Sequence, residues 1–273
     1  MNKEQLELVC RNMRRDCLVM ADAAGVSGLH FGGTLSMIEI IATLYLNVIK
    51  TGETRFISED RDRVIISKGH GVPAVYAVLH QMGIVSDEEL KTFKTDKTEL
   101  YGHPCTNSRL GIEVSTGSLG QGLSFGVGVA LALKCKNNMY SRVYVILGDG
   151  ECDEGSVWEA AMAASKYKLD NLVVIIDQNQ IQYDGKTEEI MPLNSLQSKW
   201  CSFGWECETI DGHDVLQCQN AFLKTAHIPR AIIAQTIKGK GISFMEGVPS
   251  WHHAVMTQSQ RRQAWEEIEN DKV

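Results

Sequence analysis

The chain has 273 residues, of which 44% are hydrophobic and 22% are charged, and its formal net charge is −7. This composition excludes an intrinsically disordered chain, which combines low hydrophobicity with high net charge. The acidic balance also argues against nucleic acid as a partner, because a surface that follows phosphates needs clustered positive charge. No stretch approaches the ~18 consecutive apolar residues of a membrane-spanning helix, and the length allows one large domain or two small ones.

The N-terminus and the cysteines indicate the cellular compartment. Residues 1–16 are charged from the start and lack the apolar region of a secretory signal peptide. The eight cysteines are scattered and form no Cys-X-X-Cys motif, whereas the disulfide framework of a secreted domain is smaller and denser. We therefore expect reduced thiols in a cytoplasmic protein.

The first part of the chain is predicted to be mainly helical. Apolar residues recur at helical spacing over residues 1–24, which predicts a first helix. A loop of small residues is expected at 25–33, and a second helix from about Ser36, a good N-cap, to about Val48. Residues 63–67, RVIIS, predict a short buried strand.

The middle of the chain is less regular. After Gly69 and His70 a helix is expected through Val78, and residues 86–117 combine a charged helix with an irregular stretch. Residues 120–136 predict a helix rich in Gly, although each Gly in a helix interior costs about 1 kcal/mol relative to Ala. Two explanations for these glycines stay open: close packing of the helix, or close approach of its backbone to a ligand.

Strands and helices alternate along the second half. Apolar strands are expected at 142–147, 172–177, 205–210 and 231–237. Helices are expected between them at 156–168, 195–202 and 214–226. Strands that are apolar on both faces and alternate with helices are typical of a parallel sheet covered on both sides. The predicted fold class is therefore α/β, a doubly wound and mostly parallel sheet with helices on both faces.

Candidate functional residues lie where two of these strands end. Asp149 and Gly150 directly follow the strand at 142–147, and Asn179 follows the strand at 172–177. These side chains should meet at the carboxyl ends of parallel strands, where ligands of open α/β sheets bind. A carboxylate and an amide oxygen suit Mg²⁺, and Gly150 allows close approach of a phosphate. Gly-Asp-Gly alone is usually an ordinary turn, so its placement after a buried strand favours the site.

Residues 148–179 resemble the thiamine diphosphate motif of the transketolase family, from its Gly-Asp-Gly start to its Asn end. Further segments resemble transketolase segments in the family's order, namely HFGGTLS (30–36), SKGHG (67–71), GHP (102–104), EVSTGSLGQG (113–122) and TIKGKGISFME with a later Trp-His pair (236–252). The pattern is most similar to the separately encoded N-terminal subunits of split transketolases. It implies a single thiamine diphosphate-binding domain over residues 1–273, with an N-terminal helical segment.

The resemblance assigns the metal and the cofactor to particular residues. It implies that Asp149, Asn179 and the main-chain carbonyl of Ile181 bind Mg²⁺, with Ca²⁺ and Mn²⁺ as alternative occupants. The diphosphate would contact the Gly150 N–H, His70 and His252. Gly117 and Leu119 would lie beside the aminopyrimidine and thiazolium rings.

The resemblance also implies a substrate channel lined by His30, His103 and His252. Imidazoles with a pKa near neutral are suited to proton transfer at sugar oxygens. His253 directly follows His252, and an alternative register would exchange the two.

Glu154 and Glu159 match acidic residues that face a partner subunit, link the two active sites and contribute to the cofactor site. The alternative is that they are a charge complement at a helix N-terminus and an ordinary helix residue.

The resemblance implies that another subunit is required. In this family a Glu from a pyrimidine-binding domain activates the cofactor. The sequence closes with a charged helix at 258–270 and contains no further strand–helix units. We expect an obligatory complex with a C-terminal subunit that supplies this domain and its Glu, and self-association to α2β2. The complex would transfer a two-carbon ketol unit from a ketose phosphate to an aldose phosphate, by default in pentose phosphate metabolism.

Two alternatives remain at this point. One is the α subunit of a 2-oxo acid dehydrogenase, which shares the diphosphate motif and also needs a β subunit. The other is a non-catalytic cofactor-binding subunit. A 1-deoxyxylulose-phosphate synthase fits less well, because that family carries all of its domains on one long chain.

Overall fold

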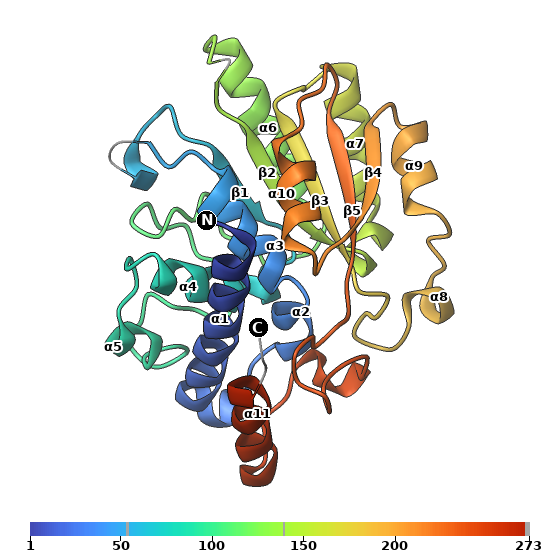
Figure 1. The fold of residues 1–273 in the computed structure, drawn as a ribbon. Coiled ribbons are helices and arrows are strands. Elements are labelled where there is room, and N and C mark those ends of the chain that lie inside the picture. Colours follow the sequence, from blue (N-terminus) through green and yellow to red (C-terminus); the bar gives the residue numbers. More distant parts are fainter. Residues whose placement is uncertain (53–54, 139, 271–273) are drawn as a thin grey trace.

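The computed structural model describes residues 1–52, 55–138 and 140–270 (Figure 1). Its centre is a five-stranded parallel sheet with the strand order β1-β2-β3-β5-β4. The strands are β1 (Arg63–Ile66), β2 (Val143–Gly148), β3 (Leu172–Gln178), β4 (Glu206–Asp211) and β5 (Arg230–Gln235). Each strand lies within two residues of its predicted bounds, which confirms the predicted α/β class.

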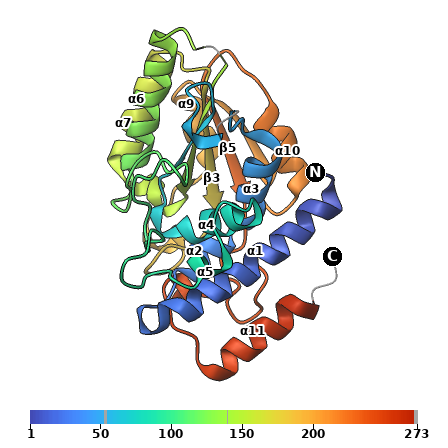
Figure 2. The same ribbon diagram turned by 90° about the vertical axis from the view of Figure 1, so that its left-hand side faces the viewer.

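Helices cover both faces of the sheet (Figure 2). The helices on one face are α6 (Gln121–Cys135), α7 (Gly155–Lys166) and α9 (Leu196–Ser202). The helices on the opposite side are α1 (Lys3–Ala24), α3 (Ile38–Thr43), α4 (Val72–Gln81) and α10 (Val215–Leu223), with α1 packed across the other three. Successive side chains of β2 enter the two cores in turn, since Val145 lies in the first and Tyr144 and Ile146 in the second.

Shorter elements complete the fold. The C-terminal helix α11 (Gln258–Asn270) packs against α1. The short α-helices are α2 (Phe31–Leu35), α5 (Asp87–Leu90) and α8 (Thr187–Ile190). Single helical turns lie at 25–27, 44–48, 55–57, 69–71, 150–153 and 249–252. Among the described residues, no helix combines the length and the hydropathy needed to span a bilayer.

The segment between the first two long helices differs from the prediction. A helix begins at Phe31, within the expected loop, and it is separate from α3. Ser36 is not an N-cap: it ends α2, and Met37 precedes α3. Ser36 is buried, and its hydroxyl donates a hydrogen bond to Asp177 at 2.6 Å. The prediction was wrong because two consecutive glycines disfavour a helix locally, and tertiary contacts with Lys238 and His70 override that preference.

The glycines of α6 serve close packing. A Cβ atom added to Gly122 would lie 2.5 Å from the Ser67 side chain, and one added to Gly126 would lie 2.5 Å from Val145. Both distances are far below ordinary van der Waals contact. Of the two explanations left open, packing of α6 against the sheet therefore accounts for these two positions.

Candidate active site

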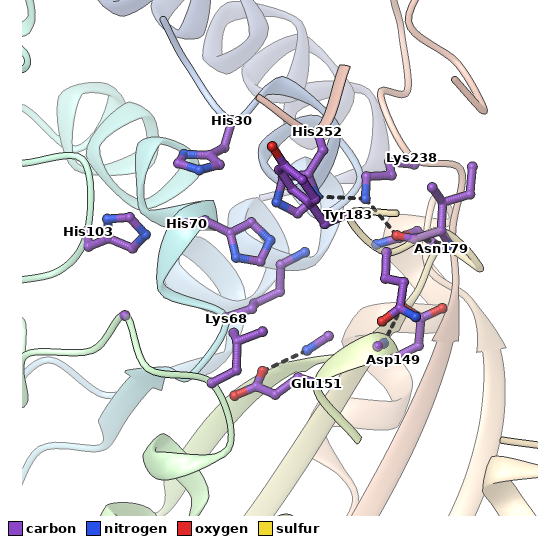
Figure 3. A pocket seen from close by; sticks show the side chains of 16 residues that line it. His30, Lys68, His70, His103, Asp149, Glu151, Asn179, Tyr183, Lys238 and His252 are labelled. Carbon is purple, nitrogen blue, oxygen red and sulfur yellow. Dashed lines mark hydrogen bonds between the residues drawn. The ribbon is translucent and has the colours of Figure 1, made fainter. Parts of the chain in front are cut away.

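A pocket with a volume of about 320 Å³ lies at the carboxyl ends of β1, β2, β3 and β5 (Figure 3). The predicted site residues that line it are His30, His70, His103, Gly117, Leu119, Asp149, Gly150, Asn179, Ile181 and His252. They come from both halves of the chain, and only the parallel sheet brings their segments to one edge. This is the position at which open α/β sheets bind their ligands.

Oxygen ligands for a cation gather at one corner of the pocket. The Asp149 carboxylate accepts hydrogen bonds from the Gly150 N–H at 2.9 Å and from the Gln180 N–H at 2.6 Å. The Asn179 amide oxygen accepts from the Ile181 N–H at 3.2 Å. No group of three or more His, Cys, Asp or Glu side chains within the described ranges is arranged to hold a metal. A cation at this corner would therefore depend on one carboxylate together with amide and carbonyl oxygens.

The corner disfavours negative charge while it holds no cation. Burial, together with the nearby Asp177 carboxylate, raises the pKa of Asp149 to about 7. A divalent cation beside Asp149 would reverse this effect, because an opposite charge at contact distance stabilises the ionised carboxylate.

Two buried lysines face this corner, and the sequence prediction did not include them. Lys68 is 1% exposed and forms an ion pair with Asp177. Lys238 is 2% exposed and donates hydrogen bonds to the Ile181 carbonyl at 2.6 Å and to His252 Nδ1 at 3.1 Å. Burial and the Lys68 charge lower the pKa of Lys238 to about 8. Both lysines follow strand ends within the quoted motifs, so the rule that located Asp149 would also have found them.

Consecutive glycines in α2 make room for these groups. A Cβ atom at Gly32 would lie 2.7 Å from the Lys238 side chain, and one at Gly33 would lie 2.7 Å from His70 Nε2. Any larger residue at these positions would displace Lys238 or His70. This packing is the physical reason why α2 forms despite its glycines.

Four histidines line the pocket; His30, His70 and His103 lie on the side away from Asp149 and Asn179, and His252 lies beside Lys238 (Figure 3). The His30 ring centroid lies 5.6 Å from that of His70, 5.4 Å from His103 and 5.6 Å from His252. Burial, with His253 and the other histidines, lowers the pKa of His30 to about 3. Burial and the Lys238 charge lower the pKa of His252 to about 4. At neutral pH both rings are uncharged, so each can accept a proton at one nitrogen and donate from the other.

The structure separates His252 from its neighbour. His252 lines the pocket, whereas His253 is exposed and does not line it, although its ring centroid lies 4.5 Å from that of His30. Glu154 and Glu159 are both exposed at the first turns of α7 and do not line the pocket. Their predicted role toward a partner stays a prediction.

A buried carboxylate that the sequence prediction also missed supports the pocket from below. Glu151 accepts hydrogen bonds from the Gly148 N–H at 3.0 Å, from the Gly120 N–H at 2.8 Å and from the Ser67 hydroxyl. These contacts join the end of β2 to the start of α6. They hold the loop of Gly117 and Leu119 against the pocket.

The fold and the site define an α/β protein with a pocket at the carboxyl edge of a parallel sheet whose lysines and imidazoles suit an anionic ligand. Comparison with known proteins identifies the family. Residues 10–271 match the family described as "Transketolase, thiamine diphosphate binding domain". The chain therefore belongs to the transketolase family, as the resemblance predicted.

Relatives show which part of a transketolase this chain corresponds to. It is 41% identical over 271 residues to one of the subunits of the apulose-4-phosphate transketolase of Phocaeicola vulgatus, covering 98% of this chain and 95% of that protein. It is also 41% identical over 245 residues to a 6-deoxy-6-sulfo-D-fructose transketolase subunit of a Clostridium species, covering 89% of each. The chain thus corresponds to the N-terminal subunit of a split transketolase, a transferase, rather than to a 2-oxo acid dehydrogenase subunit.

Transketolases encoded as one chain match it over part of their length. The crystal structure of the Campylobacter jejuni enzyme superposes with a TM-score of 0.88 at 30% identity, over 98% of this chain and 43% of that chain. Human transketolase is 37% identical over 257 residues, which cover 94% of this chain and 41% of the human protein. The chain therefore spans about two fifths of these single-chain relatives.

Proposed function

We propose that this chain binds thiamine diphosphate and Mg²⁺ as a single cofactor-binding domain. With a partner subunit that supplies the pyrimidine-binding domain and its activating Glu, it would transfer a two-carbon ketol unit from a ketose phosphate to an aldose phosphate. The observation that carries this proposal is the meeting of Asp149, Asn179 and the Ile181 carbonyl at a corner that two buried lysines face.

The residues of the corner fit a magnesium ion. A carboxylate, an amide oxygen and a main-chain carbonyl are the hard oxygen ligands that Mg²⁺ prefers, and the remaining positions would be left for water and phosphate oxygens. The ammonium of Lys238 already lies on the Ile181 carbonyl at 2.6 Å. A positive charge is therefore favourable at that oxygen, and Ca²⁺ and Mn²⁺ share the same ligand preference.

The cations and imidazoles of the pocket fit the diphosphate. Gly150, His70 and His252 would donate hydrogen bonds to its oxygens, and Lys68 and Lys238 would offset its charge. Gly117 and Leu119, which line the same pocket, would lie against the cofactor rings.

When it is bound, thiamine diphosphate supplies the carbanion chemistry that breaks and forms carbon–carbon bonds. The chain's own residues would orient the sugar and move its protons. His30 and His103 are uncharged at neutral pH, because burial lowers the pKa of both. Each would hold a sugar hydroxyl and accept or return its proton as charge develops on the oxygen. The walls of the pocket would exclude water from these transfers.

An exposed face of α6 and α7 supports the proposed partner. Phe125 is 48% exposed on α6 and Met162 is 53% exposed on α7, and the two helices pack against each other. Exposed large apolar side chains on two neighbouring helices fit a protein interface. Glu154 and Glu159 lie on the exposed side of α7, where they would face the partner within an α2β2 assembly. The cytoplasmic location also stays a prediction.

The test uses this chain co-purified with its C-terminal subunit, and each of the two chains alone serves as a control. With thiamine diphosphate and Mg²⁺, we expect two-carbon transfer by the pair and by neither chain alone. The donor panel includes pentulose and hexulose phosphates, apulose 4-phosphate and 6-deoxy-6-sulfofructose, because two relatives are named for the last two. Normal turnover by this chain alone would refute the need for a partner. A complex that binds no thiamine diphosphate would indicate a non-catalytic subunit.

A further inference from the structure

A second carboxylate lies beneath the cation corner, and the proposed reaction gives it no role. Asp177 is 0% exposed and does not line the pocket. It accepts hydrogen bonds from Asn179 Nδ2 at 3.1 Å and from the Ser36 hydroxyl at 2.6 Å, and also from Lys68 and Thr236. These donors come from the ends of α2, β1, β3 and β5.

We propose that Asp177 is a positioning residue that sets the orientation of the Asn179 amide and the place of the Lys68 ammonium, and thereby the affinity for the divalent cation. The inference rests on the proposed function, because the group that it serves is the magnesium ion of that function. Asp177 itself touches neither substrate nor cofactor.

Asp177 selects one orientation of the Asn179 amide. A side-chain amide has a donor end and an acceptor end that are nearly equal in shape, so its environment decides which end points where. An ionised Asp177 only accepts hydrogen bonds and therefore selects the NH₂ end. The amide oxygen must then point away from Asp177, toward the Ile181 N–H and the corner where a cation would bind. An amide in the opposite orientation would present N–H groups to the cation.

Asp177 also holds the ammonium of Lys68. This ammonium is fully buried beside His70 and α2, where the Nζ atom lies 3.5 Å from the Cβ position of Gly33. A buried cation without a partner is strongly unfavourable, and the Asp177 carboxylate offsets this cost. The pair holds one positive charge in the pocket wall while leaving Lys238, which donates only to uncharged groups, to act on an anion.

The four donors to Asp177 fall into two pairs, and this makes it possible to test positioning separately from structural support. Asn179 and Lys68 line the pocket, whereas Ser36 and Thr236 do not. Removing the Thr236 hydroxyl takes one hydrogen bond from Asp177 and leaves its contacts with both pocket residues. Replacing Asp177 by Asn keeps the shape but removes the acceptor-only character and the charge.

The experiment compares D177N, T236V and the unaltered chain, each co-purified with the C-terminal subunit. Mn²⁺ serves as the metal probe, with its binding followed by electron paramagnetic resonance at saturating thiamine diphosphate. Urea unfolding without metal is measured in parallel. We expect D177N to raise the Mn²⁺ dissociation constant by about 10- to 100-fold, as typical for a group that orients a metal ligand. T236V should raise the Mn²⁺ dissociation constant less than about threefold, although this variant also loses a buried hydrogen bond to Asp177.

The outcomes separate the possible roles. A D177N variant that is folded and binds Mn²⁺ as tightly as the unaltered chain overturns the inference, and so does an equal loss in T236V. If D177N does not fold, the double variant D177N/K68M removes the unpaired ammonium as well. It should fold and still bind Mn²⁺ at least about tenfold more weakly. An unaltered complex that binds neither Mn²⁺ nor cofactor would instead refute the proposed function.

Discussion

Two buried polar clusters in this chain differ in whether burial leaves their titratable groups charged or neutral. The first, which we call the clamp, consists of Arg14, Glu39 and His213. Arg14 Nη2 lies 2.5 Å from one carboxylate oxygen of Glu39, and His213 Nδ1 lies 2.8 Å from the other. Arg14 Nε also donates to the Lys240 carbonyl, and the Ile237 N–H donates to His213 Nε2. The clamp therefore holds the segment after β5 against α1 and α3.

The second cluster is the pocket, where burial shifts Asp149 and Lys238 toward their neutral forms. In the clamp, burial opposes the charged form of Glu39, but Arg14 and His213 together outweigh it and lower the pKa of Glu39 to about 2. In the pocket, burial raises the pKa of Asp149 to about 7 and lowers that of Lys238 to about 8. Both shifts favour the neutral form. The clamp is thus electrostatically complete, whereas the pocket lacks charges that a metal and a diphosphate would supply.

The largest expected effect comes from a substitution that breaks the clamp. Arg14→Met leaves the Glu39 carboxylate buried without its cation, and it should lower the free energy of unfolding by about 3–5 kcal/mol. Urea unfolding of the full chain measures this loss. The double variant Arg14→Met/Glu39→Met should recover most of it, because both charges are then absent. An equal loss in the double variant would mean that packing, rather than charge pairing, stabilises this region.

The next largest effect is expected when a proposed cation ligand of the pocket is replaced. Asp149→Asn should weaken metal-dependent cofactor binding and two-carbon transfer by the complex by at least ~100-fold, since it replaces the carboxylate among the proposed cation ligands. The unfolding free energy without cofactor should not fall, because a buried carboxyl with a raised pKa is replaced by a neutral amide. Asp153→Asn, in the following turn, is the matched control and should bind cofactor normally. Full activity of Asp149→Asn would place the metal elsewhere.

A cation of the pocket should behave unlike the cation of the clamp. Lys238→Met is expected to weaken thiamine diphosphate binding by about 10- to 100-fold, the value of a charge-assisted hydrogen bond. It should leave the unfolding free energy unchanged or higher, since Lys238 is buried and, within the described residues, its hydrogen-bond acceptors are the Ile181 carbonyl and His252 rather than a carboxylate. Isothermal titration and urea unfolding give the two values. The control is Lys240→Met, two residues along, which should bind normally. A stability loss like that of Arg14→Met would contradict the comparison.

Acidification should affect the two clusters in different pH ranges. The pKa values of His30 and His252 are lowered to about 3 and about 4, so only the unfolded chain takes up these protons below pH 6.5. These two histidines should therefore contribute a loss of stability as the pH drops from about 6.5 toward 4, which Asp149, with its raised pKa, partly offsets. Glu39 should contribute a further loss only between about pH 4.5 and 2. In unfolding measurements without cofactor, His252→Gln should reduce the first loss by about 1–2 kcal/mol. An unchanged slope above pH 4.5 would argue against a buried neutral His252.

The smallest effect concerns the surface. Glu159→Gln should change the dissociation constant of the two subunits by a few-fold at most, because an exposed charge contributes about 0–1 kcal/mol. Its unfolding free energy and its cofactor affinity should match those of the unaltered chain. Glu269→Gln, exposed on α11, is the matched control. If both variants bind the partner equally well, the alternative that Glu159 is an ordinary helix residue is favoured.

Several site residues could be predicted because their placement follows from local rules. Asp149 and Asn179 directly follow apolar strands, and parallel strands must end at a common edge. The four pocket histidines were recognised from motifs, and the structure brings their rings together. By contrast, Lys68, Lys238 and Asp177 were missed. Both lysines follow strand ends and could have been found by the same rule, whereas the ion pair of Lys68 with Asp177 is visible only in the structure.

The sequence by itself determined the parallel α/β sheet and its chemical edge, since runs of apolar, β-branched residues with helices between them have few other stable arrangements. Tertiary structure alone decided the start of α2 and the pairing of the buried charges. The helix forms at Gly32 because Lys238 packs where a Cβ would lie. The charge of Asp177 persists because three segments distant in the chain converge on it, besides Asn179 two residues away. Both depend on non-local contacts, whose energies no local pattern of residues encodes.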